Sequence, residues 1–109
     1  MLRSIKTKQR QVLEYNVIAN AAGTALTGLD ANQITMTDTG TGDKLLTLPE
    51  ALQNAVVQVT VATADAVPQI GTITSTTVQI LTFDATDGTT AKDAIVHVRI
   101  IGSKISDQY

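Results

Sequence analysis

The stretch Ala55-Val-Val-Gln-Val-Thr-Val-Ala-Thr63 decides the fold class. Val57, Val59 and Val61 recur at every second position, and the residues between them are polar. Successive side chains of a β-strand point to opposite faces, so this alternation predicts a strand with one buried and one solvated face.

The stretch from Asp93 to Ile101 repeats the pattern and predicts the last long strand, closed by Gly102. Its alternate positions form two sets, of which one holds Val96, Val98 and Ile100 and the other holds Ile95, His97, Arg99 and Ile101. Both sets are rich in apolar residues, so the alternation by itself does not decide which set faces the core.

Composition extends the β assignment to the whole sequence of 109 residues. Thr, Val and Ile make up 38 positions, and these β-branched side chains suit a pleated sheet better than a helix. A helix is an alternative at 11–19, where Val12, Tyr15 and Ala19 also have helical spacing, and residues 50–54 are expected to form a turn or one helical turn. We therefore expect an all-β fold, a single small β-sandwich or jelly-roll-like domain of about seven strands. The expected strands cover residues 11–19, 32–38, 44–48, 55–63, 69–74, 77–83 and 93–101.

Composition also excludes several classes of protein. An apolar share of 43% and a net charge of −2 argue against general disorder and against a nucleic-acid binder as a whole. The sequence has no cysteine, which excludes disulfides, thiolate metal sites and cysteine nucleophiles. No apolar run approaches the roughly 18–20 residues of a membrane span or follows the basic first residues as in a secretory signal.

Charge divides the sequence into an arm and a domain. Residues 1–13 contain four basic side chains and no acid, whereas the remaining residues carry −6. We interpret residues 1–13 as an extended basic arm, residues 14–102 as the sandwich and residues 103–109 as a tail. The arm is interpreted either as a solvated terminus, as a segment that docks on an acidic partner, or as a nucleic-acid arm. The third alternative lacks aromatic side chains for base stacking. The basic residues are Arg3, Lys6, Lys8 and Arg10.

No constellation of residues points to catalysis, a cofactor or a metal. His97 is the only histidine, and no Gly-x-Ser-x-Gly motif accompanies it. The acids Asp84, Asp87 and Asp93 lack the spacing of an EF-hand loop, and capping of a turn explains them better than a metal site. The glycines in residues 39–43 fit a hairpin turn rather than a phosphate loop. We expect a protein that is not an enzyme, with no catalytic residue, no cofactor and no metal.

The order of these segments resembles the small β-domains of tailed-phage virion proteins, such as head decoration and head-fibre-like proteins. The resemblance covers about residues 32–102. It is carried by Ile34-Thr-Met-Thr-Asp-Thr-Gly-Thr-Gly-Asp43, Leu45-Leu-Thr-Leu-Pro49, Val56-Val-Gln-Val-Thr-Val61, Ser75-Thr-Thr-Val-Gln-Ile-Leu-Thr-Phe-Asp84 and Asp93-Ala-Ile-Val-His-Val-Arg-Ile-Ile-Gly102. The sequence departs from that pattern at two aromatic positions, which are Leu46 or Leu48 and Val96 here.

The resemblance implies a non-enzymatic structural protein on the surface of a phage capsid. Its expected partners are the major capsid protein, with Arg3, Lys6, Lys8 and Arg10 as capsid-binding residues, and further copies of itself in a homotrimer. It implies no nucleic-acid, membrane or small-molecule partner. The short sequence favours a capsid decoration, or cement, protein over a fibre with a long shaft. The alternative is a receptor- or glycan-binding module at a fibre or tail tip, which the scarcity of aromatic residues disfavours.

A core of aliphatic residues with three aromatics is thin for a domain of this size, which also favours an oligomer. We expect subunit contacts at Val56, Ile95, His97 and Arg99. A guanidinium is costly to bury alone, so a carboxylate should meet Arg99 if its face is covered, and an acid of another subunit would serve.

Overall fold

A computed structural model describes residues 7–108, and these residues form strands and loops only. Among them no helix is long and apolar enough to cross a membrane. The strands are β1 (Thr7–Ala19), β2 (Leu26–Thr27), β3 (Thr35–Gly40), β4 (Asp43–Thr47), β5 (Gln53–Val61), β6 (Ala66–Ile73), β7 (Thr77–Asp84) and β8 (Val96–Gln108).

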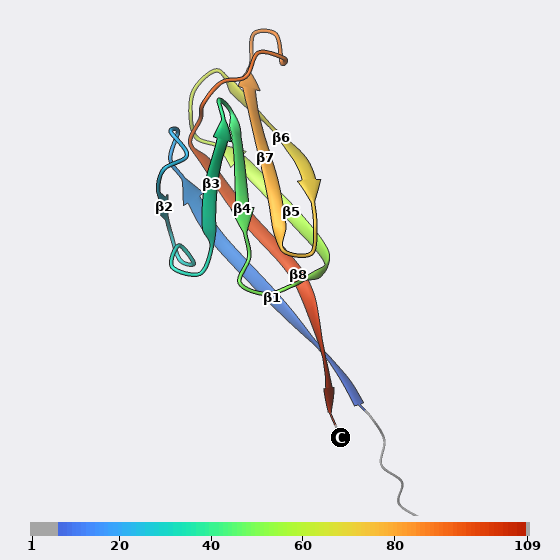
Figure 1. Cartoon of the computed structure of the whole chain (residues 1–109). Coiled ribbons are helices and arrows are strands. Elements are labelled where there is room, and N and C mark those ends of the chain that lie inside the picture. Colours follow the sequence, from blue (N-terminus) through green and yellow to red (C-terminus); the bar gives the residue numbers. More distant parts are fainter. Residues whose placement is uncertain (1–6, 109) are drawn as a thin grey trace, which may run out of the picture.

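Two four-stranded antiparallel sheets pack face to face (Figure 1). Sheet A has the strand order β2-β1-β8-β5, and sheet B has the order β3-β4-β7-β6. The prediction of an all-β sandwich is confirmed. The eighth strand is β2, a two-residue strand that lies between the expected strands at 11–19 and 32–38.

The longest pairing in the molecule joins β1 to β8, at the two ends of the described chain. All 13 residues of β1 pair with β8, from Thr7 opposite Gln108 to Ala19 opposite Val96, without a register shift. Residues 11–19 are therefore strand rather than the alternative helix. Residues 7–13 of the predicted arm and 103–108 of the predicted tail belong to these two strands, so neither proposed boundary coincides with a strand end.

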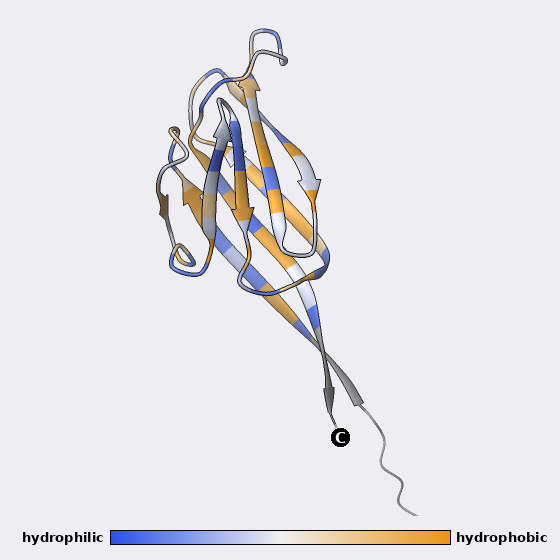
Figure 2. Cartoon of the chain, viewed as in Figure 1, coloured by the Kyte–Doolittle hydropathy of each residue, from blue (hydrophilic) through white to orange (hydrophobic). Residues whose placement is uncertain are grey.

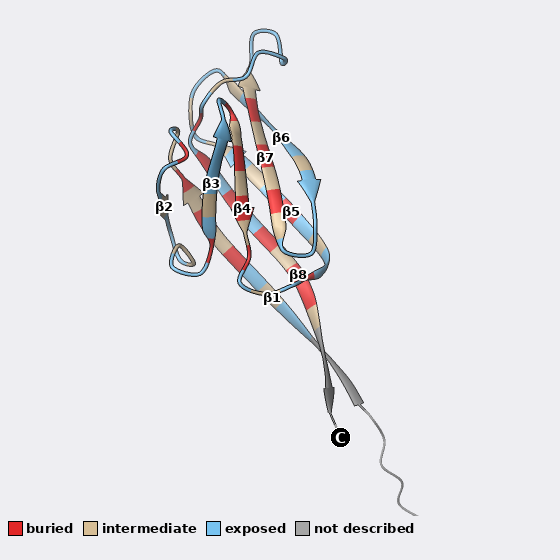
Figure 3. Cartoon of the chain, in the orientation of Figure 1, coloured by how far each residue is buried: buried red, intermediate tan, exposed pale blue. Residues whose placement is uncertain are grey.

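The core lies between the sheets and follows the predicted alternation (Figures 2 and 3). Val96, Val98 and Ile100 are the buried set of β8, whereas Ile95, His97 and Arg99 are exposed. Because β8 is flanked by β1 and β5, its buried face forms the middle of the core on sheet A. The other buried apolar side chains are Tyr15, Val17, Ala19, Ile34, Leu46, Leu48, Leu52, Val57, Val78, Ile80 and Ala94.

Lys44 is a charged residue buried within the sandwich, where the polar residues Thr82 and Ser103 are also buried. Lys44 occupies one of the two inward-facing positions of β4, the other being Leu46, and it is only 2% exposed. Its Nζ donates to the carbonyl oxygen of Ala94 at 3.2 Å, which ties β4 to the segment before β8. Burial lowers the pKa of Lys44, against a smaller opposing effect of the Asp93 and Asp38 carboxylates.

Two glycines have left-handed backbone conformations, but only one of them is also in close contact with other residues. Gly42 ends the β3–β4 turn at φ 63°, and a Cβ there would overlap the carbonyl oxygen of Thr82 and lie 2.9 Å from the Lys92 nitrogen. Gly88 has φ 69°, but a Cβ there would meet nothing within 4 Å. The hairpin turn is therefore pressed against β7 and the β7–β8 loop, whereas the Asp-Gly turn is open.

We predict that Gly42→Ala is much more destabilising than Gly88→Ala. Both variants incur the left-handed backbone cost of about 1–2 kcal/mol, but only Gly42→Ala adds a steric overlap with fixed backbone. The measurement is the free energy of unfolding in urea. Equal losses for the two variants would show that the turn is not packed as described.

We also predict a pH signature for Lys44. Because the folded state lowers its pKa, the unfolded state binds more protons, and stability rises with pH from the folded pKa up to about 10.5. Lys44→Met keeps the volume and removes the titration. The unfolding free energy of the wild type minus that of Lys44→Met should therefore increase from neutral pH towards pH 10, measured by chemical denaturation. A difference that does not change with pH would contradict the burial of this ammonium.

Candidate interaction surface

The outer face of sheet A is the surface that faces away from sheet B, and alternate residues of β1, β8 and β5 build it. Their inner neighbours are committed to the core, so the alternation fixes which side chains are left outside. This face contains the four predicted subunit contacts Val56, Ile95, His97 and Arg99. Val56 is 58% exposed and Ile95 is 39% exposed. The structure thus brings the four residues to one face.

Arg99 lies at the centre of the outer face, between β1 and β5. Its guanidinium donates to Glu14 Oε1 at 3.1 Å and to Gln58 Oε1 at 3.5 Å. The carboxylate that meets Arg99 therefore belongs to the same chain, and the β1–β8 register is what places it there. Both side chains are more than two-fifths exposed, so the pair contributes little to stability.

An open hollow of about 360 Å³ lies beside Arg99 on this face. Ile18, His97 and Thr60 form part of its floor, and Leu29 lines it from the loop after β2. Leu29 is 84% exposed, and sequence reasoning did not single it out. The Asp30 carboxylate holds this loop on β1 by accepting from the Asn16 N–H at 2.6 Å.

A second apolar area lies on the same face towards the far end of β1. Val12 is 70% exposed and Val56 is 58% exposed, and both line a hollow with Ile101. Val12 and Ile101 also escaped the predicted set of contacts. The pattern that could have found them is the alternation itself, because Ile101 shares its phase with Ile95, His97 and Arg99.

Past this area β1 and β8 continue as a two-stranded ribbon, which we define as Thr7–Gln11 paired with Lys104–Gln108 (Figure 1). The neighbouring strand β5 reaches only Ser103 of β8. Two of the predicted capsid-binding residues, Lys8 and Arg10, lie in the ribbon, opposite Asp107 and Ile105 in the register. The other two, Arg3 and Lys6, lie outside the described residues.

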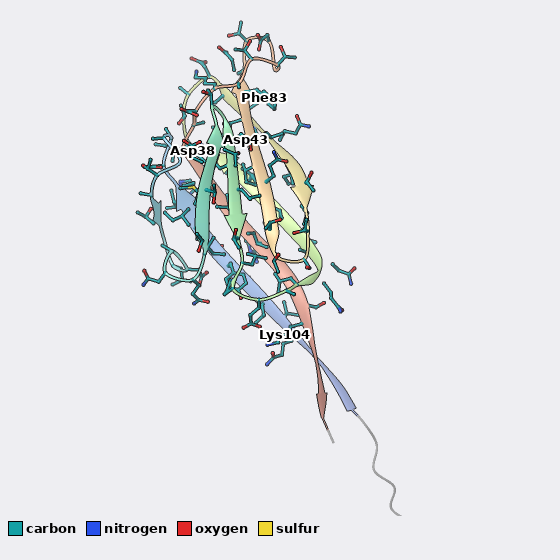
Figure 4. The ribbon with its side chains drawn as sticks, in the orientation of Figure 1. Asp38, Asp43, Phe83 and Lys104 are labelled. Carbon is teal, nitrogen blue, oxygen red and sulfur yellow. The ribbon has the colours of Figure 1, made fainter. Side chains whose placement is uncertain are left out.

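Lys104, labelled in Figure 4, lies at the root of the ribbon and forms an exposed ion pair with the sandwich. Its Nζ lies 2.7 Å from Glu50 Oε2 in the loop between β4 and β5. The hydrogen bond and charge of Glu50 raise the pKa of Lys104. Ser103 adds a second link, because its Oγ donates to the Gln53 carbonyl at 3.2 Å.

The acidic residues around the β7–β8 loop serve the backbone. Asp87 accepts from the Thr90 hydroxyl and from the N–H groups of Thr90 and Thr89, and these hydrogen bonds, the first of them most, lower its pKa to about 2. Asp84 accepts from the Thr86 N–H, and Asp93 accepts from the Gly42 N–H at 2.7 Å. Within the described range no group of three His or acidic side chains is arranged to hold a metal ion.

The two aromatic rings among residues 7–108 are not displayed as a stacking platform. Tyr15 is 5% exposed in the core, and burial raises the pKa of its hydroxyl. Phe83 is half-buried in β7. The third aromatic residue, Tyr109, is not among the described residues.

Comparison with known proteins gives no match: no family model, no curated protein and no solved structure is similar to this chain at a significant level.

We predict that Arg99→Met raises the pKa of Glu14. In the wild type the hydrogen bond from Arg99 is the largest influence that lowers this pKa, followed by the one from Asn16. The pKa of the Glu14 carboxyl, measured by NMR titration, should move up towards its usual value in the variant. A control, Lys92→Met at the other end of the domain, should leave Glu14 unchanged. An unchanged pKa in Arg99→Met would mean that the ion pair does not form in solution.

Proposed function

We propose that the protein is a non-enzymatic structural component of a tailed-phage virion, a decoration or cement protein of the capsid surface. In this role it binds the major capsid protein on the assembled head and stabilises contacts between capsomers. The observation that carries the proposal is the β1–β8 ribbon. It continues past the sandwich and carries Lys8 and Arg10 of the basic arm at one end of an otherwise acidic domain.

The sequence resemblance supports the same proposal. Its five segments coincide with the β3–β4 hairpin, β4, β5, β7 and the inner half of β8, which are the strands that form most of the core. The fold itself is common to many activities, so it contributes only compatibility.

Attachment through the basic segment fits the charge distribution. Arg3, Lys6, Lys8 and Arg10 supply +4, and the remaining residues carry −6. An acidic patch on the shell would attract the segment and repel the domain, which orients the molecule. This attraction is screened over about 8–10 Å at ordinary salt. A protein that binds only the assembled shell stabilises that state by mass action.

We predict that deletion of residues 2–6 weakens binding to heads and leaves the sandwich intact. The deletion stops before β1, which begins at Thr7, so the β1–β8 pairing is retained. Binding is measured by co-sedimentation with purified heads that lack the protein, and stability is measured by thermal unfolding.

Two controls separate charge from chain length. Replacing Arg3 and Lys6 by Gln should weaken binding less than the deletion, and more at low salt, whereas Lys92→Gln should have no effect. If the shortened protein binds as tightly as the intact one, the basic segment is not the attachment site. If the intact protein binds no heads at all, the decoration role itself is wrong.

A further inference from the structure

The exposed edges of the two sheets differ in regularity. The pairings of β3, β5 and β6 with their inner neighbours each contain a register shift, and β6 also contains Pro68. Bulges and prolines of this kind keep an edge strand from pairing with another chain. β1 has no such interruption along its 13 residues, and β2 covers only Ile18 and Ala19. Most of β1 is therefore a regular edge.

The hydrogen bonds at Asn16 show which backbone groups face that edge. Its N–H donates to the Asp30 carboxylate at 2.6 Å, and its C=O accepts from the Asp30 N–H at 3.0 Å, so both point away from β8. On the other side of sheet A, the Ile95 C=O accepts from the Ala62 N–H at 2.8 Å. The backbone groups of the odd-numbered residues of β8 therefore point towards β5, which agrees with the direction found at Asn16.

The direction of the backbone N–H and C=O groups alternates along a strand. These groups of the even-numbered residues of β1 therefore point away from β8. Between the start of β1 and the Asn16–Asp30 contact these are Lys8, Arg10, Val12 and Glu14. No strand of residues 7–108 pairs with them on that side. The edge therefore presents four consecutive pairs of outward N–H and C=O groups.

We propose that this edge pairs with the same edge of a second copy of the chain, antiparallel about a two-fold axis at Gln11. This register places Lys8 opposite the second copy's Glu14 and Arg10 opposite the second copy's Val12. It uses all four open residues and ends where Asp30 already occupies the backbone of Asn16. It also opposes a cation and an anion at both ends, which stabilises cross-strand pairs.

The two neighbouring registers are worse. An axis at Val12 would oppose Lys8 and Asn16, whose N–H and C=O are engaged by Asp30. An axis at Arg10 would oppose two arginines directly, and like charges in that position destabilise a sheet.

The pairing also answers a weakness of the ribbon. A two-stranded ribbon is at best marginally stable in water, because it lacks a third strand and a packed face. In the proposed dimer, residues 7–11 of one copy lie against residues 11–15 of the other, the part of β1 that adjoins the core. The contact stops at a dimer, because the edge of each copy is fully paired with the edge of the other and cannot bind a third copy. Its area is small, so we expect affinity in the micromolar range or weaker.

Cysteine cross-linking tests the register, and the natural sequence contains no cysteine to interfere. At the axis, Gln11 lies opposite Gln11 of the second copy in a non-hydrogen-bonded pair. The two Cα atoms of such a pair are about 4.5 Å apart, which is within the range for a disulfide. Gln11→Cys should therefore form a disulfide-linked dimer on mild oxidation. Gln9→Cys and Leu13→Cys should cross-link when mixed but not separately. Monomer only from Gln11→Cys, or efficient cross-linking of Gln9→Cys alone, would overturn the proposal.

A proline substitution tests the backbone pairing. The Val12 N–H points away from β8, so Val12→Pro removes an intermolecular donor and leaves the β1–β8 bonds in place. In sedimentation equilibrium it should raise the dimer dissociation constant about tenfold or more, equivalent to ~1.4 kcal/mol. Val12→Thr retains the N–H and should dimerise like the wild type. Equal dimerisation of Val12→Pro, a wild type that stays monomeric up to about 1 mM, or a trimer in place of the dimer would overturn the proposal. None of these outcomes depends on binding to heads, so the inference stands or fails apart from the proposed function.

Discussion

The antiparallel pairing of β1 with β8 is the constraint on which the rest of the molecule depends. It joins segments almost a full chain length apart and holds β8 between β1 and β5 in the middle of sheet A. That central position explains why the alternate residues Val96, Val98 and Ile100 are among the most deeply buried. The same register places Glu14 beside Arg99, and it makes the outer parts of β1 and β8 extend past the same end of the sandwich.

Sheet B completes the core. Leu46, Val78 and Ile80 pack against the inner face of sheet A. The ammonium group of the buried Lys44 donates a hydrogen bond to the carbonyl of Ala94. Gly42 lets the hairpin turn approach Thr82, and its N–H donates to the Asp93 carboxylate. The loops at this end are thus held by many short-range hydrogen bonds, whereas the opposite end carries the ribbon. Among residues 7–108, the loops close one end of the sandwich, and towards the other end one edge of β1 has backbone groups that no strand pairs with.

The sequence predicted the parts of this arrangement that alternate. β5 and β8 were predicted as strands from their alternation, which separated the two sets of β8, and the structure shows which of the two sets is buried. The pairing of 7–13 with 102–108 was not predictable, because polar residues such as Lys8 and Gln9 follow no apolar period. The burial of Lys44 was hidden for a related reason, since a charged side chain reads as exposed unless its acceptor is known. The intrachain partner of Arg99 required the register, which sequence alone does not supply. The capsid role comes from resemblance and charge, and it stays a proposal.

Backbone hydrogen exchange along β1, followed by NMR over a range of protein concentrations, tests the central claim most directly. In dilute protein the amides of Gln9, Gln11 and Leu13 should be protected by β8, whereas those of Arg10, Val12 and Glu14 should exchange freely. As the concentration rises, the second set should become protected while the first stays so. Free exchange of the first set would show that the β1–β8 ribbon does not form. A second set that stays unprotected at every concentration would show that the open edge has no partner in another copy of the chain.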